Sequence, residues 1–300
     1  MAELLKLTND YVFKSNFGYK GRENTTRVLL KDIFRKDIKI VELDNNTITE
    51  KEINDDKIGI MDVKAIIDNS TVCDIEMQVV RQKDIIQRIL FYWSKIFSKE
   101  VKAGESYSQA KKTICILIAN FELNNLQDIK KYISRWNLRE EEFTKKVLTN
   151  MIDIYIIELP KVEKYGEIKG YKNLNLWVKF INNPEVFEMK EEYKEDKDLK
   201  ETVDAIIEAR KNLEKLSENE HACYLADLRE KYILDQNSLL ETGYSEGLEA
   251  GLEQGKKEGI EQGKAEQQKE IAKKMLDKNI PIDTIVEVTG LSKEEIEKLK

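Results

Sequence analysis

The chain has 300 residues, of which 36% are charged and 41% are hydrophobic, and its formal net charge is −7. This length suits one large domain or two small ones, and the three prolines and high charge content favour solvated helices over an all-β sandwich. Because His221 is the single histidine, a zinc site built on imidazoles and a Ser-His-Asp triad are both disfavoured. Any chemistry must therefore depend on carboxylates, amides and lysines.

The sequence also indicates the cellular compartment of the protein. No apolar run approaches the roughly 18–20 residues that span a bilayer. The first ten residues lack the basic segment and apolar stretch of a signal peptide. The three cysteines are widely spaced and form no CxxC pair, which is typical of a reducing environment. We therefore predict a cytoplasmic protein without membrane contact.

The first third of the chain predicts helical structure followed by three strands. Helical apolar spacing over residues 8–34 is interrupted near Gly18 and Gly21. Residues 37–43 alternate as in a strand, and residues 58–79 predict two strands joined by a tight turn.

The next elements complete an α/β domain. Residues 82–103 have helical periodicity, and the continuous apolar run at 113–120 predicts a strand buried on both faces. A helical stretch at 126–149, a strand at 151–159 and a helix at 171–181 follow. The predicted order is helix, three strands, helix, strand.

The last third of the chain is predicted to be mostly helical. A highly charged segment at 191–201 suggests a boundary, and two helical stretches follow at about 197–216 and 219–240. The final block predicts three short helices, with a capping box formed by Ser292 and Glu295. The residues that delimit these helices are Asn279, Pro281 and Gly290.

This final block has the outline of a helix-turn-helix. Its last two helices are acidic, with five carboxylates against three lysines, and a basic face is preferred for reading the major groove. We therefore expect it to dock on protein rather than to read bases. The five carboxylates belong to Asp283, Glu287, Glu294, Glu295 and Glu297.

A glycine recurs at every fourth position between the helical stretches and this block. Each glycine inside a helix costs roughly 1 kcal/mol relative to alanine. Two explanations stay open: a solvated tether, or close helix pairing in a homodimer through this tail. The glycines are Gly243, Gly247, Gly251, Gly255, Gly259 and Gly263.

The two strands at 58–79 carry polar residues at alternate positions. A turn centred on Asn69 places Asp62 opposite Glu76 and Lys64 opposite Asp74, with opposed β-carbons roughly 5 Å apart. Two adjacent carboxylates repel each other unless they share a cation, and Mg²⁺ prefers such oxygen ligands. A slip of one residue would separate the pair. Alternatively, this polar face meets solvent.

A basic segment follows these strands directly. Residues 81–112 hold eight basic and three acidic residues, although the net charge of the whole chain argues against a nucleic-acid partner. The basic residues are Arg81, Lys83, Arg88, Lys95, Lys99, Lys102, Lys111 and Lys112.

Together these features resemble the PD-(D/E)XK nuclease superfamily, and more closely its recombination-promoting nuclease or putative transposase branch. The resemblance covers roughly residues 5–180, and some relatives also end in glycine-spaced helical tails. It rests on Asp62 followed by Glu76-Met77-Gln78 and on the segments NDYVFKSNFG, KIGIMDVKA, DIEMQV, RILFYWSKIF and ELPK.

The resemblance implies a fold and an activity. The fold is α/β, with a restriction-endonuclease-like core (helix, three strands, helix, strand) and a mostly helical C-terminal extension. The activity is metal-dependent cleavage of DNA, associated with recombination, mobile elements or phage defence. A catalytically inactive interaction protein on the same fold and an RNA-directed nuclease are the alternatives.

The resemblance also implies the site residues. Asp62 and Glu76 would bind the metal, with the Met77 carbonyl as a third ligand. Gln78 stands where the wider superfamily has a lysine, and an amide supplies no positive charge.

The missing charge must come from another residue, for which Lys64, Lys57 and Arg88 are the candidates. Asp10 either reaches the metal or only caps its helix. On the basic segment, Arg81, Lys83 and Arg88 would hold the DNA backbone; alternatively they form a solvated helix face.

We predict four segments along the chain. Residues 1–185 form the nuclease-like domain, and 186–241 form a charged linker and helical segment. Residues 242–268 form the glycine-spaced tail, and 269–300 form the helix-turn-helix-like module.

Overall fold

The computed structural model of the chain describes residues 3–39, 41–43, 63–101 and 104–299. It consists of two compact units, which divide between Gln236 and Asn237.

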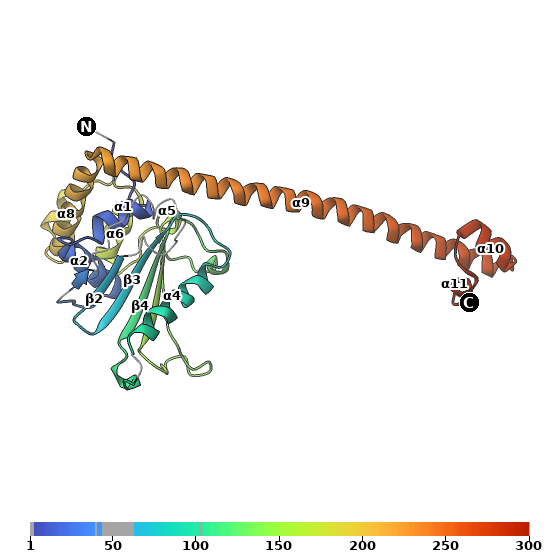
Figure 1. Cartoon of the computed structure of the whole chain (residues 1–300), viewed down its shortest axis with the longest axis horizontal. Helices are drawn as coiled ribbons and strands as arrows, with labels where there is room; N and C mark the ends of the chain where they lie inside the picture. Colours follow the sequence, from blue (N-terminus) through green and yellow to red (C-terminus); the bar gives the residue numbers. More distant parts are fainter. Residues whose placement is uncertain (1–2, 40, 44–62, 102–103, 300) are drawn as a thin grey trace. The chain divides into compact units, whose positions relative to one another are not determined.

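In the described part of the first unit, six strands form one mixed sheet in the order β1-β2-β3-β4-β6-β5 (Figure 1). The three central strands, β3, β4 and β6, run parallel, and each of the others is antiparallel to its neighbour. The strands are β1 (Val41–Leu43), β2 (Val63–Ile67), β3 (Thr71–Gln78), β4 (Lys112–Ala119), β5 (Ile133–Trp136) and β6 (Ile152–Glu158).

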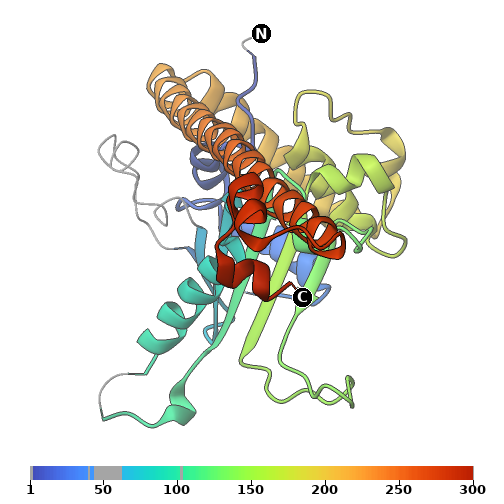
Figure 2. The ribbon, with the colours of Figure 1, turned by 90° about the vertical axis from the view of Figure 1, so that its right-hand side faces the viewer.

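Helices cover the two faces of this sheet unequally (Figures 1 and 2). One face packs with α1, α2, α6 and α8 in the larger hydrophobic core, whereas the other packs against α4 in a smaller one. The helices of this unit are α1 (Asp10–Phe17), α2 (Glu23–Phe34), α4 (Ile85–Lys99), α5 (Pro160–Tyr165), α6 (Lys172–Asn182), α7 (Glu191–Glu195), α8 (Lys200–Ser217) and the start of α9 (Glu220–Asp277).

The β2–β3 hairpin has the predicted register. Asp68 and Asn69 form its turn with φ angles of 48° and 58°, and two consecutive left-handed residues match the twist of a two-residue hairpin. Lys64 consequently lies opposite Asp74, as predicted. This register directs Cys73, Ile75 and Met77 of β3 into the larger core and the polar side chains between them to the opposite face of the sheet.

Most of the predicted elements are confirmed. The N-terminal helical stretch divides into α1 and α2 around the two glycines, and β4 lies buried between two parallel strands. The helix predicted at 126–149 is wrong. That segment contains the edge strand β5 and a loop closed by a bridge between Arg139 and Val147. β6 offers a free edge, and pairing with it outweighs the helical spacing of the segment.

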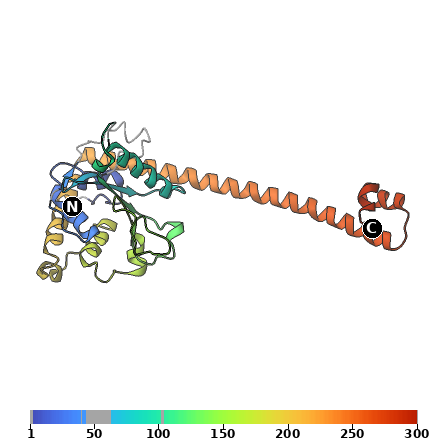
Figure 3. The ribbon, with the colours of Figure 1, turned by 90° about the horizontal axis from the view of Figure 1, so that it is seen from below.

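In the second unit, α9 continues into a small helical module with α10 (Ile282–Thr289) and α11 (Lys293–Glu297) (Figure 3). The predicted signals are confirmed: Asn279 and Gly290 adopt left-handed conformations, and Ser292 and Glu295 form the capping box. The module packs around Ala272, Ile285, Leu291 and Ile296. The two compact units are a coarser division than the four segments predicted from the sequence, whose boundaries stay a prediction.

A buried carboxylate ties three helices of the first unit together. Asp32 on α2 accepts hydrogen bonds from the Trp177 indole on α6 (2.9 Å) and the Thr202 hydroxyl on α8 (2.7 Å). Burial raises the pKa of Asp32 to about 6, because the two hydrogen bonds offset only part of the desolvation of the charged form.

Stability should therefore depend on pH through Asp32. Its pKa is higher in the folded chain than in the unfolded chain, so the folded state binds more protons between about pH 4 and 6. The free energy of unfolding should fall as pH rises through this window, by about 3 kcal/mol in total. In Asp32→Asn, whose amide oxygen can accept both hydrogen bonds, this slope should be absent. Urea unfolding at pH 4.5 and pH 7 measures the difference, and parallel pH profiles for the two proteins would contradict the assignment.

Candidate functional site

The candidate site begins with two buried polar side chains on β3. Glu76 and Gln78 are each 8% exposed and point away from the larger core, to which Ile75 and Met77 contribute their side chains. Asp74, the third polar side chain on this face of β3, is 4% exposed, so the polar face of β3 lies inside the protein. The alternative in which this face meets solvent is therefore wrong for β3.

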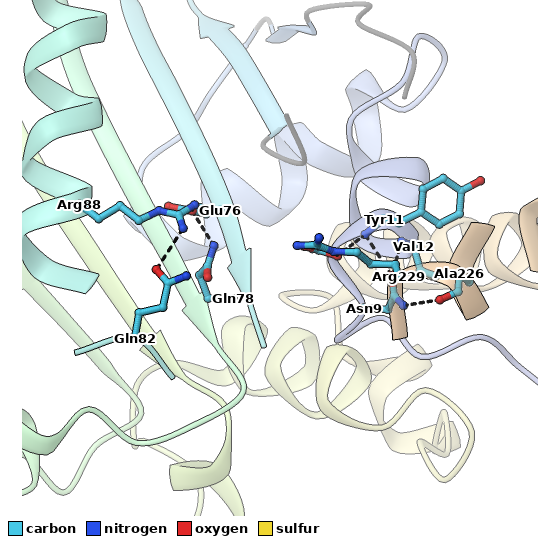
Figure 4. A network of polar contacts seen from close by, with 10 residues as sticks. Asn9, Tyr11, Val12, Glu76, Gln78, Gln82, Arg88, Ala226 and Arg229 are labelled. Atoms are coloured by element: carbon cyan, nitrogen blue, oxygen red, sulfur yellow. Dashed lines mark hydrogen bonds and ion pairs between the residues drawn. The ribbon is translucent and has the colours of Figure 1, made fainter. Parts of the chain in front are cut away.

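Arg88 reaches Glu76 from α4 (Figure 4). Its guanidinium forms an ion pair with Glu76 Oε1, and the two side chains are 11% and 10% exposed. Gln78 Nε2 donates to the same oxygen at 2.5 Å, while Arg88 Nη1 donates to Gln82 at 3.1 Å. The Arg88 guanidinium also lies 5.5 Å from the centre of the Tyr92 ring.

This arrangement identifies a positive charge beside Gln78. A buried carboxylate is expensive unless it is paired, and Arg88 provides that pairing for Glu76. Arg88 Nε is buried and has no hydrogen-bond partner in the described part of the chain. The interpretation of Arg88 as part of a solvated helix face is wrong.

The remaining predicted site residues of the hairpin are placed as follows. Asp62 and Lys57 lie outside the described residues, so the pairing of Asp62 with Glu76 stays a prediction. Lys64 is exposed on β2 opposite Asp74, and the Met77 side chain is buried in the larger core.

Asp10 on α1 forms an ion pair with Arg229 on α9, and Figure 4 shows Arg229 beside Asn9 and Tyr11. Both of its carboxylate oxygens contact Arg229, with distances of 2.6 to 3.0 Å, and one also accepts from the Tyr11 amide. The cap of α1 is Asn9, whose amide group also donates to the Ala226 carbonyl at 3.1 Å. Asp10 therefore has a structural partner that is 219 residues away in the sequence.

The two other predicted DNA contacts, Arg81 and Lys83, are exposed just before α4. The Arg81 guanidinium lies 5.8 Å from the centre of the Phe121 ring and 3.4 Å from the Asn124 side-chain oxygen. These partners lie in the segment that follows β4, at the same end of the sheet as Gln78.

Sequence reasoning missed a buried ion pair that holds this segment. Lys161 is fully buried, and its Nζ contacts Glu158 at 2.6 Å and the carbonyls of Leu126 and Ile129 at 2.7 Å each. Glu158 in turn accepts from the Leu123 amide at 2.7 Å. The ELPK segment was the available signal, since it places a glutamate and a lysine three residues apart at the end of β6.

The described residues include only part of the predicted metal site. Among the described residues, no three His, Cys, Asp or Glu side chains form a group that could hold a metal ion. Glu76 and Gln78 nevertheless present side-chain oxygens on one buried face, and such hard donors fit Mg²⁺ or Mn²⁺.

Comparison with models of known protein families shows which family the chain belongs to. A family model described as PD-(D/E)XK nuclease family transposase matches residues 7–243. The chain belongs to this family. A second model, the C-terminal HTH domain of the Rpn/YhgA-like nuclease family, matches residues 265–300. Neither a curated protein nor a solved structure matches the chain.

Membership in the PD-(D/E)XK nuclease family transposases confirms the predicted family, and the six-stranded α/β unit with its helical extension agrees with the predicted fold. The HTH match indicates a DNA-binding module at the C-terminus. None of the described helices combines the length and the apolar character that crossing a membrane requires.

The buried Lys161–Glu158 pair should be essential for stability. Lys161→Met would leave the Glu158 carboxylate buried without its counter-ion, which typically costs about 3–5 kcal/mol. Lys164→Met is the matched control, because Lys164 pairs with Glu122 at the exposed surface and should leave the unfolding midpoint nearly unchanged. Urea unfolding compares the two variants; equal midpoints would show that the buried pair contributes little.

Proposed function

We propose that this chain is a divalent-metal-dependent DNA endonuclease that hydrolyses phosphodiester bonds. Membership in a nuclease family transposase group supports a nuclease role. The observation that carries the finer proposal is the buried cluster of Glu76, Gln78 and Arg88, which combines oxygen ligands with a positive charge. A phosphodiester substrate requires both.

In this proposal, Glu76 and Asp62 hold the metal together with the Met77 carbonyl. A bound Mg²⁺ supplies an activated water and stabilises the charge that develops on the phosphate. Gln78 lies within hydrogen-bond distance of Glu76 and would orient that carboxylate or a phosphate oxygen.

Arg88 takes the role that a lysine has in the wider superfamily. When Glu76 is engaged as a metal ligand, its negative charge is neutralised and it no longer needs Arg88. The guanidinium is then free to bind a phosphate oxygen, and its Nε, which has no partner among the described residues, would be an additional donor once α4 adjusts. Arg88 would therefore exchange a protein carboxylate for the substrate phosphate.

DNA binding would involve both units of the chain. Arg81 and Lys83 would contact phosphates near the site, and such contacts give affinity without sequence information. The HTH match supports DNA rather than protein as the partner of the C-terminal module, despite the acidic charge of its last two helices. A role in recombination, mobile elements or phage defence in the cytoplasm fits this combination.

A second candidate is an inactive nuclease-fold protein that assembles through its tail. The observation that favours it is the ion pair with Arg88, which satisfies Glu76 without any metal. This candidate predicts that calorimetry detects no binding of Mn²⁺ or Mg²⁺ to the full chain.

Cleavage of supercoiled plasmid in Mg²⁺ tests the leading proposal. Asp62→Ala and Glu76→Gln should each lower the nicking rate by at least about a hundredfold, because each removes a metal ligand. Glu214→Gln is the matched control, since Glu214 pairs with Arg210 on α8, which packs on the other face of the sheet from Glu76, and it should nick at the wild-type rate. Wild-type activity in Asp62→Ala would refute the metal site, and cleavage of RNA alone would change the substrate.

Arg88 should affect metal binding and cleavage in opposite directions. Arg88→Gln removes the residue that competes for Glu76, so the affinity for Mn²⁺ measured by calorimetry should rise. The cleavage rate should nevertheless fall by about tenfold or more, because the phosphate loses its cationic partner. A variant with full cleavage, or with unchanged Mn²⁺ affinity, would show that Arg88 has only a structural role.

A further inference from the structure

Helix α4 exposes aromatic and basic side chains on the side that carries Arg88. Phe91 is 61% exposed, and the Lys95 Nζ lies 6.0 Å from the centre of its ring. The rings of Phe91 and Tyr92 meet edge to face, with their centres 5.6 Å apart. Singly exposed apolar residues are common, but two neighbouring rings that each lie beside a cation form a surface suited to a ligand.

The basic residues and Tyr92 form one line along the helix. At about 100° per residue, positions spaced four, three and four apart stay within about 60° of one another. These residues, here called the α4 stripe, are Arg88, Tyr92, Lys95 and Lys99. Figure 4 shows Arg88 extending from α4 to Glu76, so one end of the stripe lies at the candidate site. The stripe continues from there over roughly 16 Å, since each residue adds 1.5 Å.

The charge of α4 suits a polyanion. Between Ile85 and Lys99 the helix contains three basic residues and no carboxylate. Lys95 and Lys99 are exposed, and neither forms an ion pair within the described part of the chain. The chain as a whole is acidic, with a formal net charge of −7, so this uncompensated positive flank is a local exception that would attract phosphates.

We propose that the α4 stripe and Phe91 bind a single-stranded segment of the DNA whose phosphate occupies the site at Glu76. Lys95 and Lys99 would contact phosphates, while Phe91 and Tyr92 would stack on unpaired bases. Cations interleaved with stacking platforms hold a single strand without reading its sequence. The preferred substrate would therefore carry unpaired nucleotides beside the bond that is cut, as in an overhang, a flap or a melted segment.

The exposed rings favour unpaired bases over an intact duplex. In a duplex the flat faces of the bases cover one another, so a phenyl ring on a helix surface would meet mainly sugars and phosphates, with which it forms no hydrogen bond. An unpaired base instead offers its whole face to Phe91. The stripe is long enough for about five nucleotides at the 3.4 Å rise of a stacked strand, so it can hold a short unpaired segment.

This inference rests on the proposed function, because the site at Glu76 fixes where the bound strand begins. Binding is measured in EDTA, which withholds the metal and prevents cleavage, so failure of either proposal can be recognised separately. A helix-turn-helix module reads the grooves of a duplex, so a single-stranded probe reports on α4 rather than on the C-terminal module.

Fluorescence anisotropy of the full chain with a labelled oligothymidylate of about 20 nucleotides tests the aromatic contact. Phe91→Ala should raise the dissociation constant by about tenfold, because a stacked base loses its platform. Phe143→Ala is the matched control, since Phe143 is 70% exposed in the loop between β5 and β6, and it should bind as the wild type does. A wild type without affinity for the probe, or an unchanged dissociation constant in Phe91→Ala, would overturn the inference.

The salt dependence of the same binding tests the phosphate contacts. For a single strand, the logarithm of the binding constant falls with the logarithm of the salt concentration by about 0.7 for each phosphate that is neutralised. Lys95→Gln should therefore make this slope shallower by about 0.7. Lys211→Gln removes an exposed lysine from α8, on the other face of the sheet, and should leave the slope unchanged. A wild-type slope in Lys95→Gln would contradict the contact.

A blunt duplex of the same length and light scattering distinguish other partners of this face. Phe91→Ala should leave both the affinity for the duplex and the mass of the protein unchanged, and circular dichroism should show wild-type helix content. An equal loss of affinity for the duplex would mean that Phe91 contacts paired DNA. A changed mass with unchanged affinity for the oligothymidylate would mean that the face binds protein. Either result would show that the inference is wrong.

Discussion

The ion pair between Glu76 and Arg88 is the interaction on which the candidate site depends. A carboxylate on a strand that is buried on both faces needs a compensating charge, and α4 provides it by packing against the same face of the sheet. The pair thus links the covering helix to the central strand. It also holds, beside Gln78, the positive charge that an amide cannot supply.

Other buried polar contacts hold the elements around that pair. Asp10 and Arg229 join the first helix to the start of α9, while Asp32 connects three helices behind the sheet. Lys161 fixes the segment after β4, which carries the partners of Arg81. Each contact joins segments that are distant in the sequence, and the contacts of Lys161 constrain the loop after β4 more tightly than hydrophobic packing alone would.

The glycine-spaced tail at residues 242–268 is subject to a different constraint, the geometry of a single helix. The glycine period of four residues does not match the helical repeat, and the line of residues that stays on one face contains only three of the six glycines. Leucine and tyrosine side chains continue that line toward the nuclease unit.

Local chemistry determined much of this protein. The turn at Asp68 and Asn69 set the hairpin register, and the cap at Ser292 and the stop at Gly290 were readable because each depends on neighbouring residues alone. The tertiary structure decided which distant groups meet. The partner of Asp10 lies on α9, the partner of Glu76 lies on a separate helix, and residues 133–136 form a strand because the edge of β6 is available to them. Pairing between distant segments depends on the packing of the whole unit, which leaves no periodic signal in a single sequence.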